Sequence, residues 1–360
     1  MDTLQIILMA ILLFIPACSW KTDADSSKPS VSTDTVAVDT DELNTTVDED
    51  SATDSTTDSE SISDTVTSHS DTNKTKDTGI VIEGQLSTGT YSTVAAAWGH
   101  TMAITSGGVL NCWGETCPTS KKWPTEELSK ICTGSPVTCG LTKKDGRVIC
   151  WSKSEYDLYG VVEKTPTDDG FSDLSCNGDR YGCAVHTAGS ISCWGVDDGS
   201  SYDAGIVTNT PKESNFTDIA TGIYHACALN QAGDIICWGN DVVDGRTYKP
   251  DQIADIIAGS SYTCVLRDDG GVECWGENSS VTNSVTDDTF LSIDSGPSAV
   301  CGITSEYKVR CWGTDAEDFP STSSPSYVSV AVSVGHVCAI RDDQRVECWG
   351  NDNYGQSSPP

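Results

Sequence analysis

The sequence predicts an all-β repeat protein, and three observations predict it. Seven tryptophans each follow a short β-branched run, and six of the seven stand in the tripeptide Cys-Trp-Gly. Successive tryptophans are 38, 43, 44, 37, 37 and 37 residues apart, and a near-constant period of this size is typical of a repeat array or a propeller. No long segment after the N-terminal apolar run has the 3.6-residue apolar period of an amphipathic helix. The seven positions are Trp113, Trp151, Trp194, Trp238, Trp275, Trp312 and Trp349.

The first element in chain order is an export signal. Residues 4–15 are apolar except for Gln5, and they end in Ile15-Pro16-Ala17-Cys18. Twelve residues are too few to span a bilayer as a helix, which needs about 20, but they suit the apolar core of a signal peptide. The tetrapeptide resembles a bacterial lipobox, in which the cysteine is lipidated and becomes the new N-terminus. We therefore predict a lipoprotein signal peptide over residues 1–17 and lipidation at Cys18, which would anchor the chain to a membrane.

The residue after this cysteine bears on location. Ser19 rather than aspartate follows Cys18, and in the sorting pattern of lipoproteins this favours the outer membrane of a Gram-negative cell. We expect the chain at the cell surface or on the periplasmic face of that membrane. The segment Met1-Asp2-Thr3 lacks the usual lysine or arginine, so a secretory signal without lipidation is the alternative.

The second element is a disordered acidic linker over residues 18–83. Residues 19–85 contain 16 acidic residues and 4 lysines and almost no aromatic side chains. Such a composition cannot bury enough apolar surface to offset the entropy lost on ordering. A flexible coil of about 67 residues has an r.m.s. reach of roughly 45 Å. A stalk is the favoured interpretation, and a recognition tail is the alternative.

The remaining residues, 86–360, contain 36 acidic and 17 basic residues, a net charge of −19. Binding to a phosphate backbone needs clustered lysine and arginine, so nucleic acid is excluded as a partner. The charge also predicts solubility and repulsion from anionic lipid, and we expect a monomer.

Within this part, each repeat is predicted to hold an entry strand and a β-hairpin. The unit from Phe216 to Gly239 shows the order: a β-branched run, a second run containing Cys227, a turn with Gly233, and a third run ending in Trp238. Runs of this kind punctuated by Gly and Asp are typical of strands and tight turns. The same order returns at residues 253–276, 290–313 and 327–350.

The hairpins account for most of the cysteines. In the fifth repeat, pairing Leu266 with Val272 places Cys264 opposite Cys274, on the same face of the ladder. Facing Cβ atoms lie about 4.5–5.5 Å apart, so strand twist must bring the sulfurs within bonding range. The same offset of ten, or eleven in the first pair, predicts disulfides in six hairpins: Cys139–Cys150, Cys183–Cys193, Cys227–Cys237, Cys264–Cys274, Cys301–Cys311 and Cys338–Cys348.

Four cysteines lie outside this scheme. The first repeat has Met102 where the strand cysteine should stand, so Cys112 needs another partner, and Cys117 is the nearest. Cys132 and Cys176 each precede a hairpin cysteine by seven residues. They are therefore expected at equivalent places in adjacent repeats and could form a bridge. The sequence alone leaves the pairing of these four open.

Metal binding is the alternative use of so many cysteines. The sequence has no Cys-x-x-Cys and no histidine set at zinc spacing, and the turns at 268–270 and 342–343 do not match a calcium loop. We expect disulfides in an oxidising, exported environment, and neither a metal nor a cofactor.

Several conspicuous side chains have structural explanations. His100, His225 and His336 precede the first hairpin position by two residues in their repeats, which predicts buried structural imidazoles rather than a catalytic base. The seven repeated tryptophans are predicted to pack between neighbouring sheets. Trp98 and Trp123 fall outside the repeated position and are the better candidates for an exposed contact.

The last repeat carries a family resemblance. It contains Gly335-His336-Val337-Cys338-Ala339-Ile340 and then Trp349-Gly350-Asn351-Asp352-Asn353-Tyr354-Gly355-Gln356, which is similar to the repeat of the regulator of chromosome condensation family. The resemblance covers about residues 84–360 and implies a seven-bladed β-propeller of that type, with four-stranded blades around a central channel. Residues 84–87 resemble the tail of the same motif and are expected to complete the last blade, which removes exposed sheet edges. An open solenoid is the rival architecture.

The resemblance says less about function. Chromatin members of the family bind nucleosomes and a small GTPase, but the acidic charge and the export signal speak against both here. Bacterial members include a secreted inhibitor that caps β-lactamases. We expect a membrane-anchored binding module without catalysis, whose loops at 115–130, 152–172 and 195–215 present a propeller rim to a protein or glycan. The alternatives are an inhibitor of a hydrolase and a propeller lyase or glycosidase, which would need paired carboxylates that do not stand out in the sequence.

Overall fold

The computed structural model describes residues 85–117, 123–134, 137–152, 157–176, 180–240, 246–247, 252–314, 316, 319 and 325–360. The chain divides into two compact units, residues 1–74 and 75–360, and all described residues belong to the second. The predicted signal peptide, the lipidation site Cys18 and the linker over 18–83 lie outside the described residues. Within the described ranges, no helix has the length and apolarity needed to cross a membrane.

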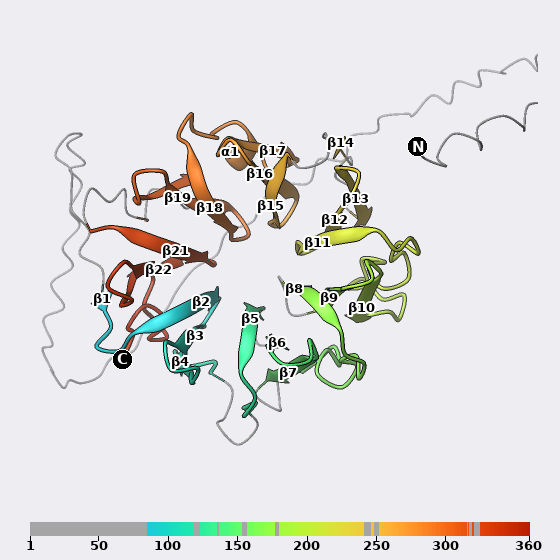
Figure 1. The fold of residues 1–360 in the computed structure, drawn as a ribbon, viewed down its shortest axis with the longest axis horizontal. Coiled ribbons are helices and arrows are strands. Elements are labelled where there is room, and N and C mark those ends of the chain that lie inside the picture. Colours follow the sequence, from blue (N-terminus) through green and yellow to red (C-terminus); the bar gives the residue numbers. More distant parts are fainter. Residues whose placement is uncertain are drawn as a thin grey trace, which may run out of the picture. The chain divides into compact units, whose positions relative to one another are not determined.

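The second unit is a seven-bladed β-propeller, which confirms the predicted fold class. Seven antiparallel sheets stand around a common centre in chain order (Figure 1). Blades 1 to 3 contain β2 (Tyr91–Ala97), β3 (His100–Thr105), β4 (Leu110–Trp113); β5 (Leu128–Thr133), β6 (Val137–Thr142), β7 (Val148–Ser152); and β8 (Phe171–Ser175), β9 (Tyr181–His186), β10 (Ile191–Gly195). Blade 4 contains β11 (Phe216–Thr221), β12 (His225–Asn230), β13 (Asp234–Gly239) and β14 (Arg246–Thr247), and blade 5 contains β15 (Ile253–Ala258), β16 (Tyr262–Arg267) and β17 (Val272–Gly276). Blade 6 contains β18 (Phe290–Ser295), β19 (Ala299–Thr304) and β20 (Val309–Gly313), and blade 7 contains β21 (Tyr327–Val332), β22 (His336–Arg341), β23 (Val346–Gly350) and β1 (Gln85–Leu86).

The expectation of four strands in every blade is wrong for the described residues, because five of the seven sheets have three strands. The segment after the third strand instead inserts one buried apolar side chain beneath the next blade's tryptophan. Val161, Ile206, Val281 and Phe319 fill this role in blades 2, 3, 5 and 6. The backbone carbonyl of Ile206 also accepts a hydrogen bond from the indole of Trp238, at 2.9 Å. One of these segments includes the single described helix, α1 (Ser279–Thr282).

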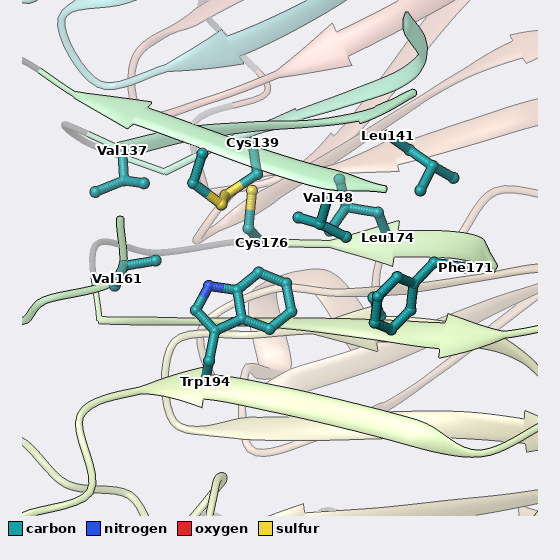
Figure 2. Close-up of a cluster of buried hydrophobic side chains, with 11 residues drawn as sticks. Val137, Cys139, Leu141, Val148, Val161, Phe171, Leu174, Cys176 and Trp194 are labelled. Carbon is teal, nitrogen blue, oxygen red and sulfur yellow. A yellow bond between two sulfur atoms is a disulfide. The ribbon is translucent and has the colours of Figure 1, made fainter. Parts of the chain in front are cut away.

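Each repeated tryptophan packs against the hairpin of the preceding blade, as predicted. Figure 2 shows Trp194 of blade 3 facing Cys139, Val148 and Leu141 of blade 2. The same arrangement recurs in the other six interfaces. In six interfaces the indole packs on a hairpin disulfide, and at the interface of blades 1 and 2 Trp151 packs on Met102 instead.

Sixteen cysteines form eight disulfides. In all six predicted hairpin pairs the two cysteines are directly opposite, with Cα atoms 4.0–4.1 Å apart. Cys112 bonds to Cys117, and Cys132 bonds to Cys176 across two blades. These two cysteines are not at equivalent places, however. Cys132 faces Cys139 in the ladder, whereas Ser175 faces the corresponding cysteine of blade 3, so Cys176 stands one residue further along.

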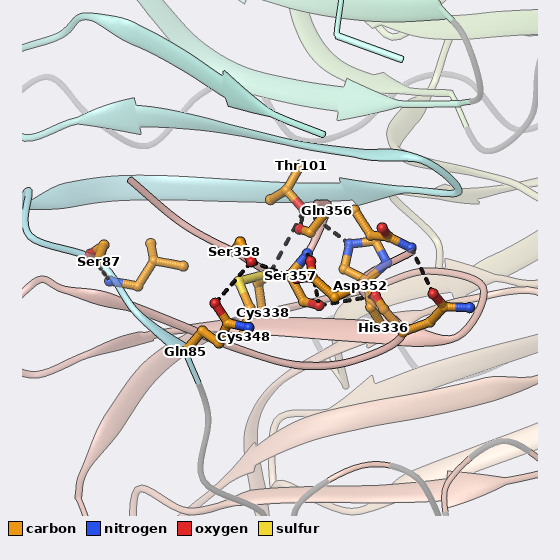
Figure 3. The surroundings of a disulfide bond; sticks show 12 residues. Gln85, Ser87, Thr101, His336, Cys338, Cys348, Asp352, Gln356, Ser357 and Ser358 are labelled. Atoms are coloured by element: carbon orange, nitrogen blue, oxygen red, sulfur yellow. Dashed lines mark hydrogen bonds between the residues drawn. A yellow bond between two sulfur atoms is a disulfide. The ribbon is translucent and has the colours of Figure 1, made fainter. Parts of the chain in front are cut away.

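The ring closes between blades 7 and 1, with the two ends of the propeller held together. β1 pairs with β23, so residues from the N-terminal side complete blade 7 as expected. The backbone N–H of Thr88 donates to the carbonyl of Pro360 at 2.8 Å, and Ser358 Oγ donates to Gln85 Oε1 at 2.8 Å. Thr101 Oγ1 of blade 1 donates to the carbonyl of Gln356 (Figure 3). The closed ring rules out the open solenoid.

A side-chain bond crosses every seam between neighbouring blades. His336, His100 and His225 each place Nε2 near a threonine hydroxyl of the next blade, at 2.9, 3.4 and 2.9 Å. Tyr181 and Tyr262 donate from the same strand position to backbone carbonyls of the next blade. The histidines are fully buried, so they have the structural role that the sequence predicts.

The two remaining seams use other chemistry. Val137 and Ala299 occupy the corresponding position in blades 2 and 6, and their side chains have no polar atom. The seam after blade 2 contains the Cys132–Cys176 disulfide. At the seam after blade 6, Asp294 Oδ2 accepts the backbone N–H of Val332 at 2.7 Å.

Candidate functional site

The strand directions give the propeller two distinct faces. One, here called the loop face, holds the turns between first and second strands and the segments after third strands. The other, here called the hairpin face, holds the tight turns between second and third strands and the starts of the inner strands. Ladder pairs such as Thr101–Trp113 lie toward the loop face, and pairs such as Ile104–Leu110 lie toward the hairpin face.

An aromatic and cationic cluster lies on the loop face of blades 2 to 4. The guanidinium carbon of Arg180 lies 5.0 Å from the ring centre of Tyr202 and 5.6 Å from that of Tyr224. The ring centre of Tyr159 lies 5.8 Å from that of Tyr202. Tyr202 is 51 % exposed, so the cluster presents aromatic surface to solvent although its members contact one another. We call these four residues the tyrosine–arginine cluster.

The segment that carries Tyr202 is held in place by carboxylates. Asp203 accepts the backbone N–H of Gly199 at 2.9 Å and that of Gly205 at 2.8 Å. The hydroxyl of Thr208 donates to Asp197. Aspartate bonded to nearby backbone N–H groups favours compact turns. Tyr202 therefore projects from an ordered turn, and little backbone entropy of this loop needs to be lost on binding.

The predicted loops contribute unequally. The loops predicted at 152–172 and 195–215 supply Tyr159 and Tyr202, so the structure brings them together in the cluster. The loop predicted at 115–130 is described only in part. Within it, Trp123 packs partly buried against the core between blades 1 and 2, so the expectation of an exposed contact at this residue is wrong. Trp98 is 46 % exposed, as expected, and its ring lies 4.9 Å from that of Tyr354.

The central channel holds a second group of polar residues. A cavity of about 280 Å³ is lined by the inner strands of the blades. The third residue of the inner strand is Lys130 in blade 2 and aspartate in the next three blades, at positions 173, 218 and 255. Lys130 Nζ lies 2.5 Å from Asp173 Oδ1, and Asp173 Oδ2 accepts the backbone N–H of Ile219 in the next blade at 3.1 Å.

The channel carboxyls have divergent acidities. Burial opposes ionisation of Asp173, but the charge of Lys130 and the hydrogen bonds to this carboxyl together outweigh burial and lower its pKa. Burial and the neighbouring Asp173 carboxylate raise the pKa of Asp218 well above its ordinary value. Burial also raises the pKa of Asp255 to about 6 and that of Asp294 to about 7. The pKa values of the neighbouring carboxyls Asp173 and Asp218 are thus shifted in opposite directions.

Paired carboxyls with separated pKa values also occur in acid–base sites. Here Asp173 and Asp294 each accept a backbone N–H of the following blade, which gives them a role in joining the ring. Among the described residues, no three His, Cys, Asp or Glu side chains are arranged to hold a metal ion. The loop face therefore offers the stronger candidate site.

The comparisons with known proteins agree with the fold. The family described as "Regulator of chromosome condensation (RCC1) repeat" matches residues 216–243 and 327–356, in blades 4 and 7. The ectodomain of the receptor kinase CR4 from Physcomitrella patens superposes with a TM-score of 0.59 at 22 % identity, over 73 % of this chain and 74 % of that one. The ectodomain of the Arabidopsis thaliana receptor kinase ACR4 gives 0.59 at 20 % identity, over 74 % and 98 %.

A third similar structure is yeast RCC1 (Prp20), solved bound to Kap60. It gives a TM-score of 0.51 at 13 % identity, over 82 % of this chain and 98 % of that one. The search of curated proteins found no match. Together with the geometry, these similarities show a propeller of RCC1 type that carries RCC1-like repeats.

Sequence reasoning missed the tyrosine–arginine cluster and the channel charges. The cluster combines residues from three different blades, and neither Arg180 nor Tyr224 departs from a local pattern. The channel charges had a signal, because Lys130, Asp173, Asp218 and Asp255 stand at the same position of successive repeats. Aligning the inner strands would have revealed it.

Proposed function

We propose that this protein is a membrane-anchored binding module, at the cell surface or in the periplasm, which captures a partner protein on its loop face. The observation that carries the proposal is the tyrosine–arginine cluster. Tyrosine and arginine are enriched among the residues that dominate interface energetics. Arg180 lies between two tyrosine rings, which orients its guanidinium before a partner arrives.

Several other features support a protein partner. Two channel carboxyls, Asp173 and Asp294, accept backbone N–H groups of the next blade, and this structural role favours binding over catalysis. Yeast RCC1 (Prp20), which has a similar fold, has been solved bound to a protein, Kap60. The acidic linker fits a stalk that holds a monomeric propeller away from the membrane, and the lipobox-like tetrapeptide ending in Cys18 supports an outer-membrane anchor.

The binding proposal is tested with the full-length protein purified in detergent. Proteins retained by wild type are compared with those retained by the Arg180→Ala/Tyr202→Ser variant, with Val109→Ser on the hairpin face as the matched control. We expect one protein to be retained by wild type and by the control but lost from the cluster variant. Equal retention by all three would refute the placement. Cluster-dependent binding on a glycan array instead would make the ligand a glycan.

The anchor is tested separately. Cys18→Ala should abolish incorporation of radiolabelled palmitate and release the protein from the membrane fraction. Density-gradient separation of the membranes should place the wild-type protein in the outer membrane. Unchanged labelling of the variant would contradict lipidation at this residue.

A further inference from the structure

The seven blades provide an internal comparison at the second residue of the inner strand, which is exposed in every blade. In blades 1 to 4 this residue is serine or threonine, and its hydroxyl donates to a carbonyl of the second strand. The bonds are Ser92–Ile104, Ser129–Leu141, Ser172–Val185 and Thr217–Leu229, at 3.2–3.3 Å. Blades 6 and 7 have Leu291 and Val328 at this position, each 52 % exposed. These two side chains give up the hydrogen bond and present apolar surface to solvent.

A second departure from the repeat lies in the tight turn of blade 6. Every blade has one turn residue at positive φ, and five blades place glycine there: Gly108, Gly146, Gly189, Gly233 and Gly270. A Cβ on Gly146 would come within 2.4 Å of the Phe171 carbonyl of the next blade, so glycine suits the position sterically as well. Blade 6 has Tyr307 instead, with φ 62° and 49 % of the residue exposed. Residues other than glycine are strained in this conformation.

In blade 7, the non-glycine residue of the turn forms a hydrogen bond to the neighbouring blade. This residue is Gln344, with φ 68°, and Gln344 Oε1 accepts a hydrogen bond from Ser106 of blade 1 at 3.0 Å. The side chain therefore helps to hold blades 7 and 1 together. Among the described residues, the Tyr307 side chain makes no such hydrogen bond to the next blade, although its position in the turn is equivalent. Strain kept for an exposed side chain suggests a role in binding.

These three departures meet at one seam. The N–H of Tyr307 donates to the carbonyl of Thr304, which pairs with Phe290, the neighbour of Leu291. The carbonyl of Tyr307 accepts the N–H of Tyr327, the neighbour of Val328. These hydrogen bonds place Leu291, Tyr307 and Val328 one after another along the hairpin face at the seam between blades 6 and 7, and we call them the seam patch.

We propose that the seam patch is a second docking site, which binds a cationic amphipathic segment of a partner protein. Its three side chains supply apolar and aromatic contact. The exposed carboxylates Glu306 and Asp342 flank them, beside the cations Lys308 and Arg341, and the propeller as a whole has a net charge of −19. Charge complementarity between these groups and a partner would steer the encounter and set its specificity. The site lies on the face opposite the tyrosine–arginine cluster, so the module would hold two partners at once.

Charge also argues against other occupants. The linker over residues 19–85 has a net charge of −12, and a second copy of the propeller has −19, so both are repelled by the net negative charge of the propeller. An anionic membrane surface is repelled for the same reason. A positively charged protein segment remains the occupant that fits.

The test gives the patch a hydroxyl residue at the strand position, as in blades 1 to 4, and glycine in the turn, as in blades 1 to 5. The triple variant Leu291→Ser/Val328→Ser/Tyr307→Gly in the full-length protein restores two possible hydroxyl donors and the glycine of the turn. The probe is a 12-residue peptide of alternating lysine and leucine, and binding is measured by fluorescence anisotropy. We expect at least a tenfold loss of affinity in the variant. The midpoint of urea unfolding should stay equal or rise, because the substitutions follow the repeat.

The control variant is Val109→Ser, which removes an equally exposed apolar side chain from the same face in blade 1 and should leave peptide binding unchanged. A peptide of alternating glutamate and leucine should bind at least tenfold more weakly than the lysine peptide. A lower urea midpoint in the triple variant would show that the three side chains stabilise the fold, and it would overturn the proposal. Equal peptide binding by wild type and variant would also overturn it, as would patch-dependent binding to vesicles of anionic lipid. Arg180→Ala should not change peptide binding, so this test is independent of the loop-face proposal.

Discussion

Cys132 of blade 2 is bonded to Cys176 of blade 3, at a seam where Val137 is the first residue of the second strand. We call a histidine or tyrosine in this strand position a latch when its side chain bonds to the next blade. Histidine or tyrosine at that position reaches the next blade at five other seams. The valine side chain cannot form a hydrogen bond to the next blade, and the disulfide joins the two blades instead. It also lines the channel, where the inner strands of neighbouring blades come closest.

Removing this disulfide should cost more than removing a hairpin disulfide. Cys132 and Cys176 are 44 residues apart in sequence, whereas the hairpin cysteines are 10 or 11 apart. In the chain-entropy model these loops correspond to about 4 and about 3 kcal/mol. Cys132→Ala/Cys176→Ala should therefore lower the free energy of unfolding more than Cys227→Ala/Cys237→Ala. Urea unfolding of both double variants checks this, and an equal or reversed order would show that chain entropy does not dominate.

The buried histidine latches predict sensitivity to acid. Burial lowers the pKa of His336 to about 4, and burial together with the neighbouring His336 lowers that of His100 to about 4. A histidine with a depressed folded-state pKa stabilises the fold above its ordinary pKa of 6.5, and this stability is lost as the pH falls toward 4. His336→Leu removes the bond to the Thr101 hydroxyl and should lose about 1 kcal/mol at pH 8.

The same variant should be less sensitive to acid than wild type. The difference between their urea midpoints should shrink between pH 6.5 and pH 4. In this range His336 takes up a proton when wild type unfolds, and this favours the unfolded state of wild type only. A difference that stays constant over this range would mean that His336 does not couple folding to pH.

Much of the fold was predictable because several features of the repeat indicate the same structure. The spacing of the tryptophans, the ten-residue cysteine offset and the glycine turns all specify the same hairpin. The number of strands in each blade and the path of the segment after the third strand were not predictable from this pattern. Residues 196–215 form turns around Asp203 and insert Ile206 beneath Trp238, and no periodic pattern marks a segment that packs through one side chain.

The candidate site was less accessible to sequence reasoning than the fold. Tyr159, Arg180, Tyr202 and Tyr224 become neighbours only when three blades are placed side by side. The one-residue displacement of Cys176 relative to Cys132 has a similar cause. The connection between first and second strands is longer in blade 3, so counting back from the hairpin cysteine gives the wrong strand position.

The channel carboxyl at the seam between blades 6 and 7 predicts the opposite pH dependence. Burial raises the pKa of Asp294 to about 7 from an ordinary 3.8. Its contribution to stability is complete below pH 3.8 and is lost as the pH rises through 7, because the folded state then carries a buried carboxylate. Asp294→Asn keeps an oxygen that can accept the Val332 N–H, and it removes the charge.

This variant should therefore be more stable than wild type at pH 8 and closest to it near pH 4. Urea unfolding of both proteins at the two pH values measures the change. A variant that is less stable than wild type at pH 8 would show that the carboxylate contributes more through its hydrogen bond than it costs through burial.

The Tyr262 latch between blades 5 and 6 allows the contribution of one seam to the free energy of unfolding to be measured. The Tyr262 hydroxyl donates toward the carbonyls of Gly296 and Ala299, at 2.6 and 3.0 Å, and the ring is fully buried. Tyr262→Phe keeps the ring and leaves two buried carbonyls without this donor, which should cost about 1–3 kcal/mol. Tyr307→Phe is the matched control, because its hydroxyl belongs to an exposed residue and its loss should change stability by less than about 0.5 kcal/mol. Urea unfolding and hydrogen exchange of blades 5 and 6 measure both, and protection should fall at this seam first. If Tyr262→Phe matched wild type in both measurements, the seam bonds would contribute specificity of packing rather than stability.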